Sequence, residues 1–336
     1  MNSAADSTQA AAAAAGLPWL VADVGGTNAR FGWIADAAGG VDHVRKLPVA
    51  AHAGLGEAAQ AYLAELAPLI GGAAPHKAAI AVATAIRGDH VHLTNSDWSF
   101  SRAALAQRLK LDSLLVLNDF EALALSLPRL KASQLRAHGA LPQPAGMLAA
   151  VGPGTGLGVG GVLQTAHGWV AVAGEGGHAT LAAADDFEAQ LLAAVRAEHK
   201  HVSAERLLSG IGLPTLHAGV ASVLGQRTET LDARAIVERF NAGGDALCRR
   251  TIDVFCAMLG GFAGNVALTL GARGGLYIAG GIVPRLGDAF FASAFRQRFE
   301  DKGRFSDYLR AIPTALVTDT LAALAGAAHA IEQHAR

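Results

Sequence analysis

The sequence has few charged residues and almost no net charge. Asp, Glu, Lys and Arg make up 16% of its 336 residues, and 27 basic residues against 28 acidic ones give a formal charge of −1. Charged residues usually form about 25% of a chain. A chain this neutral offers no basic field for nucleic acid or an anionic membrane, so both kinds of partner are disfavoured.

Cysteine is equally scarce. The two cysteines, Cys248 and Cys256, lie in one apolar segment, and their spacing matches neither a disulfide framework nor a Cys-x-x-Cys zinc site. We therefore expect two reduced cysteines in the core. A chain of this length buries roughly three quarters of its surface on folding, so it does not need disulfides or bound metals to stabilise the fold.

The N-terminal segment lacks the positive charge of a secretory signal, because no Lys or Arg precedes Arg30. We expect residues 1–16 to form a disordered tail and the protein to be cytoplasmic. The uncharged stretch 254–272 approaches the length of a bilayer span. Its glycines and Asn265 instead favour a buried, closely packed helix.

Glycine, in contrast, is abundant: the chain holds 40, which is about 12% of its residues against a usual ~7%. Residues 20–34 and 147–163 each have the pattern of a strand, a glycine-rich turn and a second strand. This repetition predicts two related α/β lobes. We expect a small lobe over 17–129 with 318–336, a large lobe over 130–317, and a hinge near 127–131 and 318.

Apolar periodicity predicts the other elements. Helices are expected over 57–69, 101–109, 187–198, 204–208, 233–241, 245–270 and 320–334, with a helical stretch from 119 to 127, and strands over 78–83, 114–117 and 275–279. The strand at 275–279 is expected to be the last one, and Gly280-Gly281 to begin the last helix.

The first candidate site is the turn at 23–28, with the sequence Asp-Val-Gly-Gly-Thr-Asn. The backbone N–H groups of its two glycines can face phosphate oxygens, and its Thr and Asn add side-chain donors. Asp23, at the strand end, can hold Mg²⁺ through water. The same residues equally suit an ordinary hairpin turn with a capping Asn.

The second candidate is the run 152–161, which has five glycines between 152 and 160. A structural turn needs one or two, so a phosphate-binding loop is favoured here. Gly156, Gly158 and Gly161 fit GxGxxG, but the strand that follows argues against a dinucleotide fingerprint, which needs a helix. The chain has no Gly-Lys pair, which excludes a Walker A loop.

Two further candidates carry carboxylates. Asn118-Asp119 ends a predicted strand, where Asp119 can take a proton from a hydroxyl, although both residues also suit a helix N-cap. Glu175-Gly176-Gly177-His178 and Glu205 suit a polyhydroxylated ligand, since a carboxylate accepts hydrogen bonds from neighbouring hydroxyls. Their alternatives are a solvated loop charge for Glu175 and a helix-surface charge for Glu205.

Taken together, seven segments resemble the bacterial glucokinase family of the hexokinase-like superfamily. They are ADVGGTNAR at 22–30, LTNSDW at 93–98, NDF at 118–120, GTGLG at 154–158, EGGH at 175–178, SAERLLSG at 203–210 and AGGIVPR at 279–285. Each is weak alone, but their shared order over nearly the whole chain, from about Leu20 to the C-terminal helix, is specific.

The resemblance implies an actin-like ATPase (ribonuclease H-like) fold: two α/β lobes, each with a mixed sheet, and a cleft between them. It also implies ATP-dependent phosphorylation of D-glucose at the 6-hydroxyl, feeding glycolysis, with Mg²⁺ and a homodimer. ATP-binding roles pass to Ala22, Asp23, Val24, Gly25, Gly26, Thr27, Asn28, Gly154, Thr155, Gly156, Gly280 and Gly281. Sugar-binding roles pass to Asn95, Asn118, Asp119, Glu175, His178 and Glu205, with Asp119 as the catalytic base.

One departure and three rival functions remain. Relatives in the ROK group usually carry a cysteine-rich zinc motif after the Glu-x-x-Gly-His segment, which this chain lacks, so we expect no zinc and a non-ROK glucokinase. The rivals are a kinase of another hexose on the same fold, a non-catalytic sugar sensor, and an actin- or chaperone-like ATPase switch.

Overall fold

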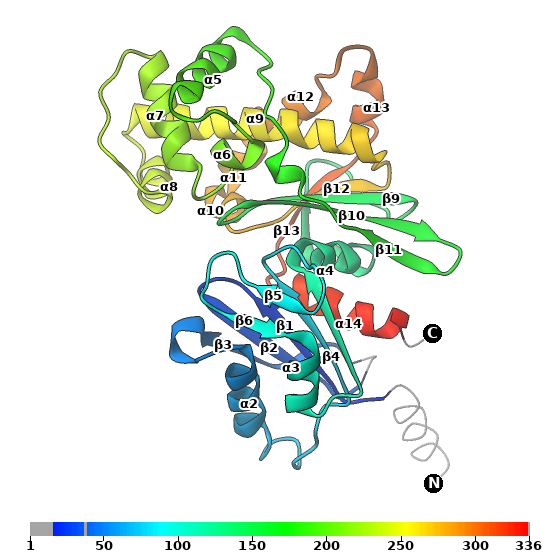
Figure 1. Cartoon of the computed structure of the whole chain (residues 1–336). Helices are drawn as coiled ribbons and strands as arrows, with labels where there is room; N and C mark the ends of the chain where they lie inside the picture. The colour runs from blue at the N-terminus through cyan, green and yellow to red at the C-terminus, as the bar shows by residue number, and fades with distance from the viewer. Residues whose placement is uncertain (1–15, 37–38, 335–336) are drawn as a thin grey trace. The chain divides into compact units, whose positions relative to one another are not determined.

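The computed structural model describes residues 16–36 and 39–334 and divides into two compact units (Figure 1). The first unit comprises the described residues up to 127, residues 166–173 and those from 320 onward; the second comprises 128–165 and 174–319. Fifteen of the sixteen residues of the expected tail, 1–15, lie outside the described residues.

The first unit contains a five-stranded sheet in the order β3-β2-β1-β4-β7. Its strands are β1 Trp19–Val24, β2 Asn28–Ile34, β3 Asp42–Pro48, β4 Lys77–Val82 and β7 Ser113–Asn118. β1, β4 and β7 are parallel, with Val24 paired to Val82 and Val82 to Asn118. This register brings the carboxyl ends of three strands to one edge, where ligands bind in open α/β sheets.

Helices cover both faces of this sheet, as the alternation of side chains along β1 requires. Leu20 and its alternate neighbours pack with α2 (Leu55–Leu66) and α3 (Arg102–Leu109), whereas Trp19 and Val21 pack with α14 (Ala322–His334). α14 also packs on α4 (Asp119–Ser126), so closely that a Cβ on Gly326 would lie 1.6 Å from the Ala122 carbonyl oxygen. The unit is completed by β5 His90–His92, β6 Ser99–Ser101, β11 Gly168–Val172 and the 3-10 helix η1 Val49–Ala51.

The second unit also has a mixed sheet, with its strands in the order β10-β9-β12-β13-β8. They are β8 Leu135–Ala137, β9 Met147–Pro153, β10 Leu157–Thr165, β12 Gly275–Ile278 and β13 Thr314–Val317. β9 and β10 form an antiparallel hairpin, and β9, β12 and β13 are parallel. Each unit therefore contains a strand-turn-strand hairpin joined to parallel strands, as the repeat at 20–34 and 147–163 predicts.

Helices dominate the rest of the second unit. They are α5 Asp186–Glu198, α6 Ala204–Leu207, α7 Leu213–Val223, α8 Ala233–Ala242, α9 Ala246–Leu270, α10 Val283–Leu286, α11 Asp288–Ala292, α12 Phe295–Glu300 and α13 Ser306–Arg310, with 3-10 helices η3 Ala132–Gln134, η4 Gly176–His178 and η5 Gly303–Phe305. A further 3-10 helix, η2 Leu127–Arg129, lies where the first unit meets the second in the chain.

The long helix α9 is apolar and long enough to cross a membrane, but 72% of its most apolar window is buried in the structure. A Cβ on Gly260 would lie 2.1 Å from the Phe295 carbonyl oxygen, so the glycine allows α12 to approach closely. Cys248 and Cys256, also on α9, are buried free thiols. The expectations of a buried, closely packed helix and of reduced core cysteines are confirmed.

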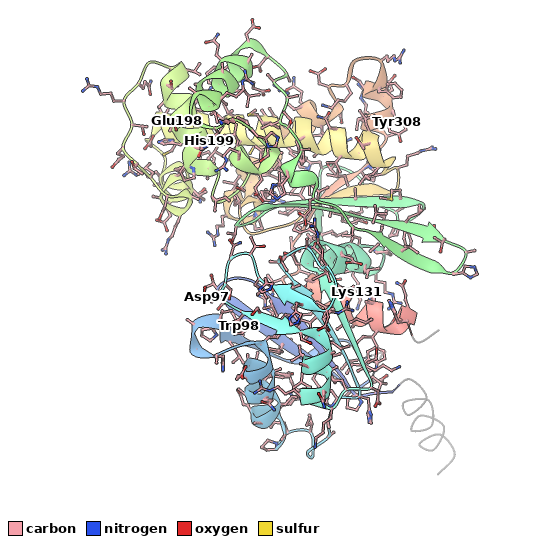
Figure 2. All side chains as sticks on the ribbon, in the orientation of Figure 1. Asp97, Trp98, Lys131, Glu198, His199 and Tyr308 are labelled. Carbon is pink, nitrogen blue, oxygen red and sulfur yellow. The ribbon has the colours of Figure 1, made fainter. Side chains whose placement is uncertain are left out.

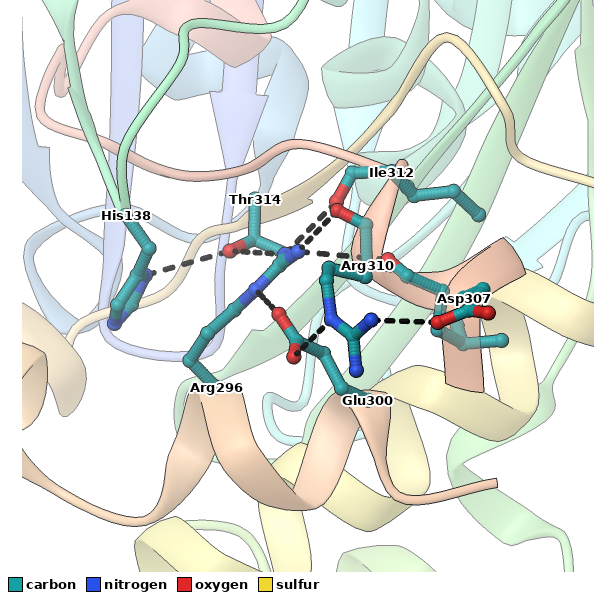
Figure 3. A network of polar contacts seen from close by, with 8 residues as sticks. His138, Arg296, Glu300, Asp307, Arg310, Ile312 and Thr314 are labelled. Carbon is teal, nitrogen blue, oxygen red and sulfur yellow. Dashed lines mark hydrogen bonds and ion pairs between the residues drawn. The ribbon is translucent and has the colours of Figure 1, made fainter. Parts of the chain in front are cut away.

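A half-buried arginine holds α12 against the end of the sheet (Figure 3). Arg296 donates to Glu300, to the Thr314 hydroxyl and to the backbone carbonyls of Leu309, Arg310 and Ile312. These carbonyls lie at the end of α13 and just before β13, so one guanidinium ties the end of the helix to the start of the strand.

Two expectations about the order of elements are wrong. The strand at 275–279 is not the last, because β13 follows it, and Gly280-Gly281 precede the four-residue helix α10 rather than the last helix. A four-residue apolar run such as 314–317 is too short for periodicity to tell a strand from a helix. Expected helices and strands elsewhere match observed elements to within a few residues.

Candidate functional site

The first glycine turn is fixed by backbone contacts. Ala22, Asp23 and Val24 end β1, Gly25, Gly26 and Thr27 form the turn, and Asn28 begins β2. The Gly25 N–H donates to the Asn28 carbonyl at 3.0 Å, and the Thr27 carbonyl accepts from Val49 at 2.9 Å. A Cβ on Gly26 would lie 2.4 Å from the Asn95 carbonyl oxygen, so the turn packs directly on the segment that carries Asn95.

Asp23 lies beside this turn with its side chain 29% exposed, and its carboxylate is 3.9 Å from the Arg30 guanidinium. Burial raises the pKa of Asp23 above its ordinary value, and the Arg30 charge partly offsets that rise. Within residues 16–36 and 39–334 no three His, Cys, Asp or Glu side chains gather in a way that could hold a metal ion.

A cavity of about 830 Å³ opens next to the turn, within the first unit. Asn95, Asp97 and Trp98 are among its lining residues, and Asp97 and Trp98 are labelled in Figure 2. The full lining is Gly26, Thr27, Val49, Ala50, His52, Ala53 and residues 94–98. The cavity is rich in hydroxyl, amide and backbone groups, which suits a polar ligand of small-molecule size.

Asn118 and Asp119 lie at the same edge of the sheet, where β7 ends and α4 begins. Asn118 is the N-cap: its Oδ1 accepts from the Phe120 N–H at 2.9 Å and its backbone N–H donates to Glu121 at 3.3 Å. The capping interpretation of Asn118 is thus confirmed. The same amide donates through Nδ2 to the Thr84 carbonyl at 3.2 Å, and one carboxylate oxygen of half-buried Asp119 accepts from the Phe120 N–H at 2.9 Å.

The second glycine turn, residues 154–156, is held by a neighbouring loop. The Gly154 carbonyl accepts from the Gly210 N–H at 2.8 Å, and the Thr155 carbonyl accepts from Ile211 at 3.1 Å. Gly280 has a φ of +82°, and a Cβ there would lie 2.5 Å from the Pro153 carbonyl oxygen, whereas Gly281 faces open space. Gly280 therefore packs directly against the turn, and only glycine suits that position.

Glu205 connects this turn to the Glu175–His178 segment. Its carboxylate accepts from the Leu157 N–H at 2.8 Å and lies 3.8 Å from His178 Nδ1, with 22% of its side chain exposed. A Cβ on Gly156 would lie 2.4 Å from the same carboxylate. The interpretation of Glu205 as a helix-surface charge is wrong, because α6 presents its carboxylate to the backbone next to the glycine turn. Glu175, just before η4, is exposed.

The predicted residues thus fall into two groups, each within one unit. Gly26, Asn95 and Asn118 gather in the first unit; Gly156, Gly280, Glu205 and His178 gather in the second. Sequence reasoning missed Thr84 and Gly210, which contact these groups. Thr84 lies just after the parallel strand β4, at the edge where Asn118 ends β7, so its place after the strand was an available signal.

Comparisons with known proteins agree on one family. A family model described as Glucokinase matches residues 20–334. The chain is similar to the glucokinases of Aromatoleum aromaticum (49% identity; 94% of this chain and 95% of that one) and Chromobacterium violaceum (46%; 94% and 90%). Among solved structures it is similar to a glucokinase from an Antarctic psychrotroph, with a TM-score of 0.85, 39% identity, and coverage of 94% and 98%.

A more distant structure extends the likeness in fold. A glucokinase from Balamuthia mandrillaris in complex with glucose matches with a TM-score of 0.74 at 18% identity, covering 98% of this chain and 99% of that one. With the mixed α/β sheet of each unit, these matches confirm the expected actin-like ATPase fold.

Proposed function

The chain belongs to the glucokinase family, and from that membership we infer that it transfers the γ-phosphoryl group of ATP to the 6-hydroxyl of D-glucose. The observation that carries this inference is the position of Glu205. A sugar kinase must hold its phosphate donor beside a polyhydroxylated acceptor. One Glu205 oxygen accepts from the Leu157 N–H, next to a glycine turn, and the carboxylate lies near His178, a second polar group for a sugar.

We propose that the two glycine turns bind the phosphates of ATP through backbone N–H groups. Gly25, Gly26 and Thr27 form one turn and Gly154, Thr155 and Gly156 the other, while Gly280 and Gly281 lie on the adenosine side. Ala22, Asp23, Val24 and Asn28 complete the first nucleotide-binding segment. Close packing at Gly26, Gly156 and Gly280 supports this proposal, because it gives each turn a fixed shape before a ligand arrives.

Asp119 is the proposed general base. As the 6-oxygen of glucose forms its bond to the γ-phosphorus, the bond from that phosphorus to the β,γ-bridging oxygen breaks, and ADP leaves. The hydroxyl proton passes to the Asp119 carboxylate. General-base catalysis contributes about 10²–10⁴-fold to such a step, and the remainder of the catalysis is positioning and charge stabilisation.

The sugar itself is assigned to residues of both groups. We propose that Asn95, Asn118 and Asp119 bind it from the first unit and Glu175, His178 and Glu205 from the second. The two compact units support the proposal of two lobes, over 17–129 with 318–336 and over 130–317, joined by a hinge.

Magnesium is the proposed metal, with Asp23 holding it through water. A carboxylate oxygen is the ligand class that Mg²⁺ prefers, and Mg²⁺ needs only one or two protein carboxylates. When bound, Mg²⁺ would neutralise charge on the ATP phosphates. We also propose a cytoplasmic homodimer, on the family resemblance alone; sedimentation analysis would measure the mass of the assembly.

The direct test is a coupled assay of ADP release with ATP and Mg²⁺, without sugar and then with glucose, fructose, mannose, galactose or N-acetylglucosamine. We expect turnover that depends on glucose. Turnover with another sugar would instead indicate a different hexose kinase. ADP release without sugar would favour an ATPase switch, and no release at all a sugar sensor.

A further inference from the structure

Thr84 lies between the two segments of the first unit that carry Asn95 and Asn118. It follows β4 at the ligand-binding edge of the sheet, where the Ala83 N–H donates to the Val24 carbonyl at 3.2 Å. The Thr84 hydroxyl accepts from the Thr94 hydroxyl at 3.1 Å, and the Thr84 carbonyl accepts from Asn118 Nδ2 at 3.2 Å. One residue therefore contacts both neighbouring segments.

The segment that carries Asn95 is anchored at its ends by buried Leu93 and Trp98, and Trp98 Nε1 donates to the His52 carbonyl at 3.2 Å. Asn95 and Thr94 are exposed, and the hydrogen bonds inside this loop run from Leu93 to Trp98 and from Trp98 to Ser96, so they shape the loop without joining it to β4. The loop rests on Gly26 on one side. On the other side, the hydroxyl pair of Thr94 and Thr84 joins it to the end of β4.

We propose that Thr84 and Thr94 form a positioning pair that sets Asn95 relative to Asn118 for binding the sugar hydroxyls. Polar side chains that recognise a ligand must be held to about 0.5 Å, and supporting hydrogen bonds supply that precision. Neither threonine touches the reacting atoms in this account. The inference rests on the proposed function and adds to it two residues that determine sugar affinity.

The test compares two substitutions at one position. Thr84→Val keeps the shape of the side chain and removes the hydroxyl, so the hydrogen bond from Thr94 is lost while the Asn118 contact, made to backbone, remains. We expect the KM for glucose to rise about three- to tenfold, which is the effect of losing one ordinary hydrogen bond. Both kcat and the KM for ATP should stay within about twofold of the wild-type values. The substitution weakens sugar binding equally in the ground state and the transition state, which raises KM and leaves kcat unchanged.

Thr84→Ser keeps the hydroxyl and should restore the KM for glucose to within about twofold of the wild-type value. Thr230→Val, at an exposed position before α8, is the matched control and should change nothing. A glucose KM that is unchanged in Thr84→Val, or raised equally in Thr84→Ser and Thr84→Val, would overturn the inference.

A double-mutant cycle tests whether the two threonines act as one pair. Thr94 lies on an exposed loop. Thr94→Val therefore removes the same hydrogen bond without placing a valine at the half-buried position 84. We expect Thr84→Val with Thr94→Val to raise the glucose KM no more than either change alone, since they remove the same bond. Additive effects would contradict the pair. Failure of the proposed function can be distinguished from failure of the threonine pair, because in the first case the wild-type protein would show no glucose-dependent ADP release.

Discussion

The two glycine turns have the same strand-turn-strand plan but are held in place differently. In the first unit, Gly26 rests on the backbone of Asn95 and the Thr27 carbonyl accepts from Val49, so neutral backbone groups fix the turn. In the second unit, a carboxylate, Glu205, bonds to the Leu157 N–H next to the turn. The first turn thus depends on the absence of a side chain, and the second depends also on a charge.

This difference indicates how each unit couples phosphate binding to sugar binding. In the first unit, the turn and the proposed sugar residue Asn95 are in direct van der Waals contact. In the second unit, Glu205 itself reaches toward both the turn and His178. A packing change should therefore disturb the first unit most, and a charge change the second.

The largest expected effect is the loss of kcat when the proposed base is removed. This base, Asp119, belongs to the first unit alone. Asp119→Asn should lower kcat by about 10²–10⁴-fold, since an amide cannot accept the hydroxyl proton. Circular dichroism and the melting temperature should match the wild-type protein. Steady-state kinetics checks the prediction, and near-normal turnover would remove Asp119 from this role.

The next effect tests the charge in the second unit. Glu205→Ala leaves the Leu157 N–H without its acceptor and should lower the free energy of unfolding by about 1–3 kcal/mol. The KM values for glucose and for ATP should both rise, because one side chain supports both sites. Glu198→Ala, at an exposed position on α5, is the control. A rise in the KM for one substrate only would disprove the shared role of Glu205.

A third prediction tests packing in the first unit with two adjacent glycines. The methyl group of Gly26→Ala would meet the Asn95 backbone at 2.4 Å, whereas that of Gly25→Ala would find its nearest neighbour, the Asn28 carbonyl, at 3.7 Å. Gly26→Ala should cost about 1–3 kcal/mol of stability, and Gly25→Ala less than about 0.5 kcal/mol. Urea unfolding measures both, and equal losses would rule out the contact as the cause.

The smallest expected effect is a change in how the stability of the protein depends on pH. His138 lies among Phe290, Phe291 and Phe295 in the second unit, with Arg136 and Arg296 nearby. Burial, together with these arginine charges, lowers the pKa of His138 to about 4. The pKa of His138 is therefore lower in the folded state than in the unfolded state. As a result, the contribution of His138 to stability is present above pH ~6.5 and is lost as the pH falls toward ~4.

His138→Phe should remove this part of the pH dependence. Urea unfolding at pH 7 and pH 5 should show a smaller loss of stability in the variant than in the wild-type protein. After correction for the intrinsic exchange rate, which itself falls with acid, amide protection should decrease first in the sheet of the second unit, because His138 follows β8. An identical pH dependence in the two proteins would show that His138 does not titrate with unfolding.

Local patterns predicted much of the fold and part of the site. The hairpins at 19–34 and 147–165, the cap at Asn118 and the buried helix α9 follow from apolar runs, glycine positions and capping residues, which are all local signals. The contact of Glu205 with Leu157 and that of Thr84 with Thr94 were missed. They join residues separated along the chain, and only the packing of loops brings such residues together.

In the proposed reaction, both glycine turns bind the ATP phosphates while Asp119 receives the hydroxyl proton. The most direct measurement is a crystal structure of the enzyme with glucose and a non-hydrolysable ATP analogue. We expect phosphate oxygens within hydrogen-bonding distance of backbone N–H groups in residues 25–27 and 154–156, with the 6-hydroxyl hydrogen-bonded to Asp119. Phosphates that contact neither turn, or a 6-hydroxyl out of reach of Asp119, would contradict the proposed reaction.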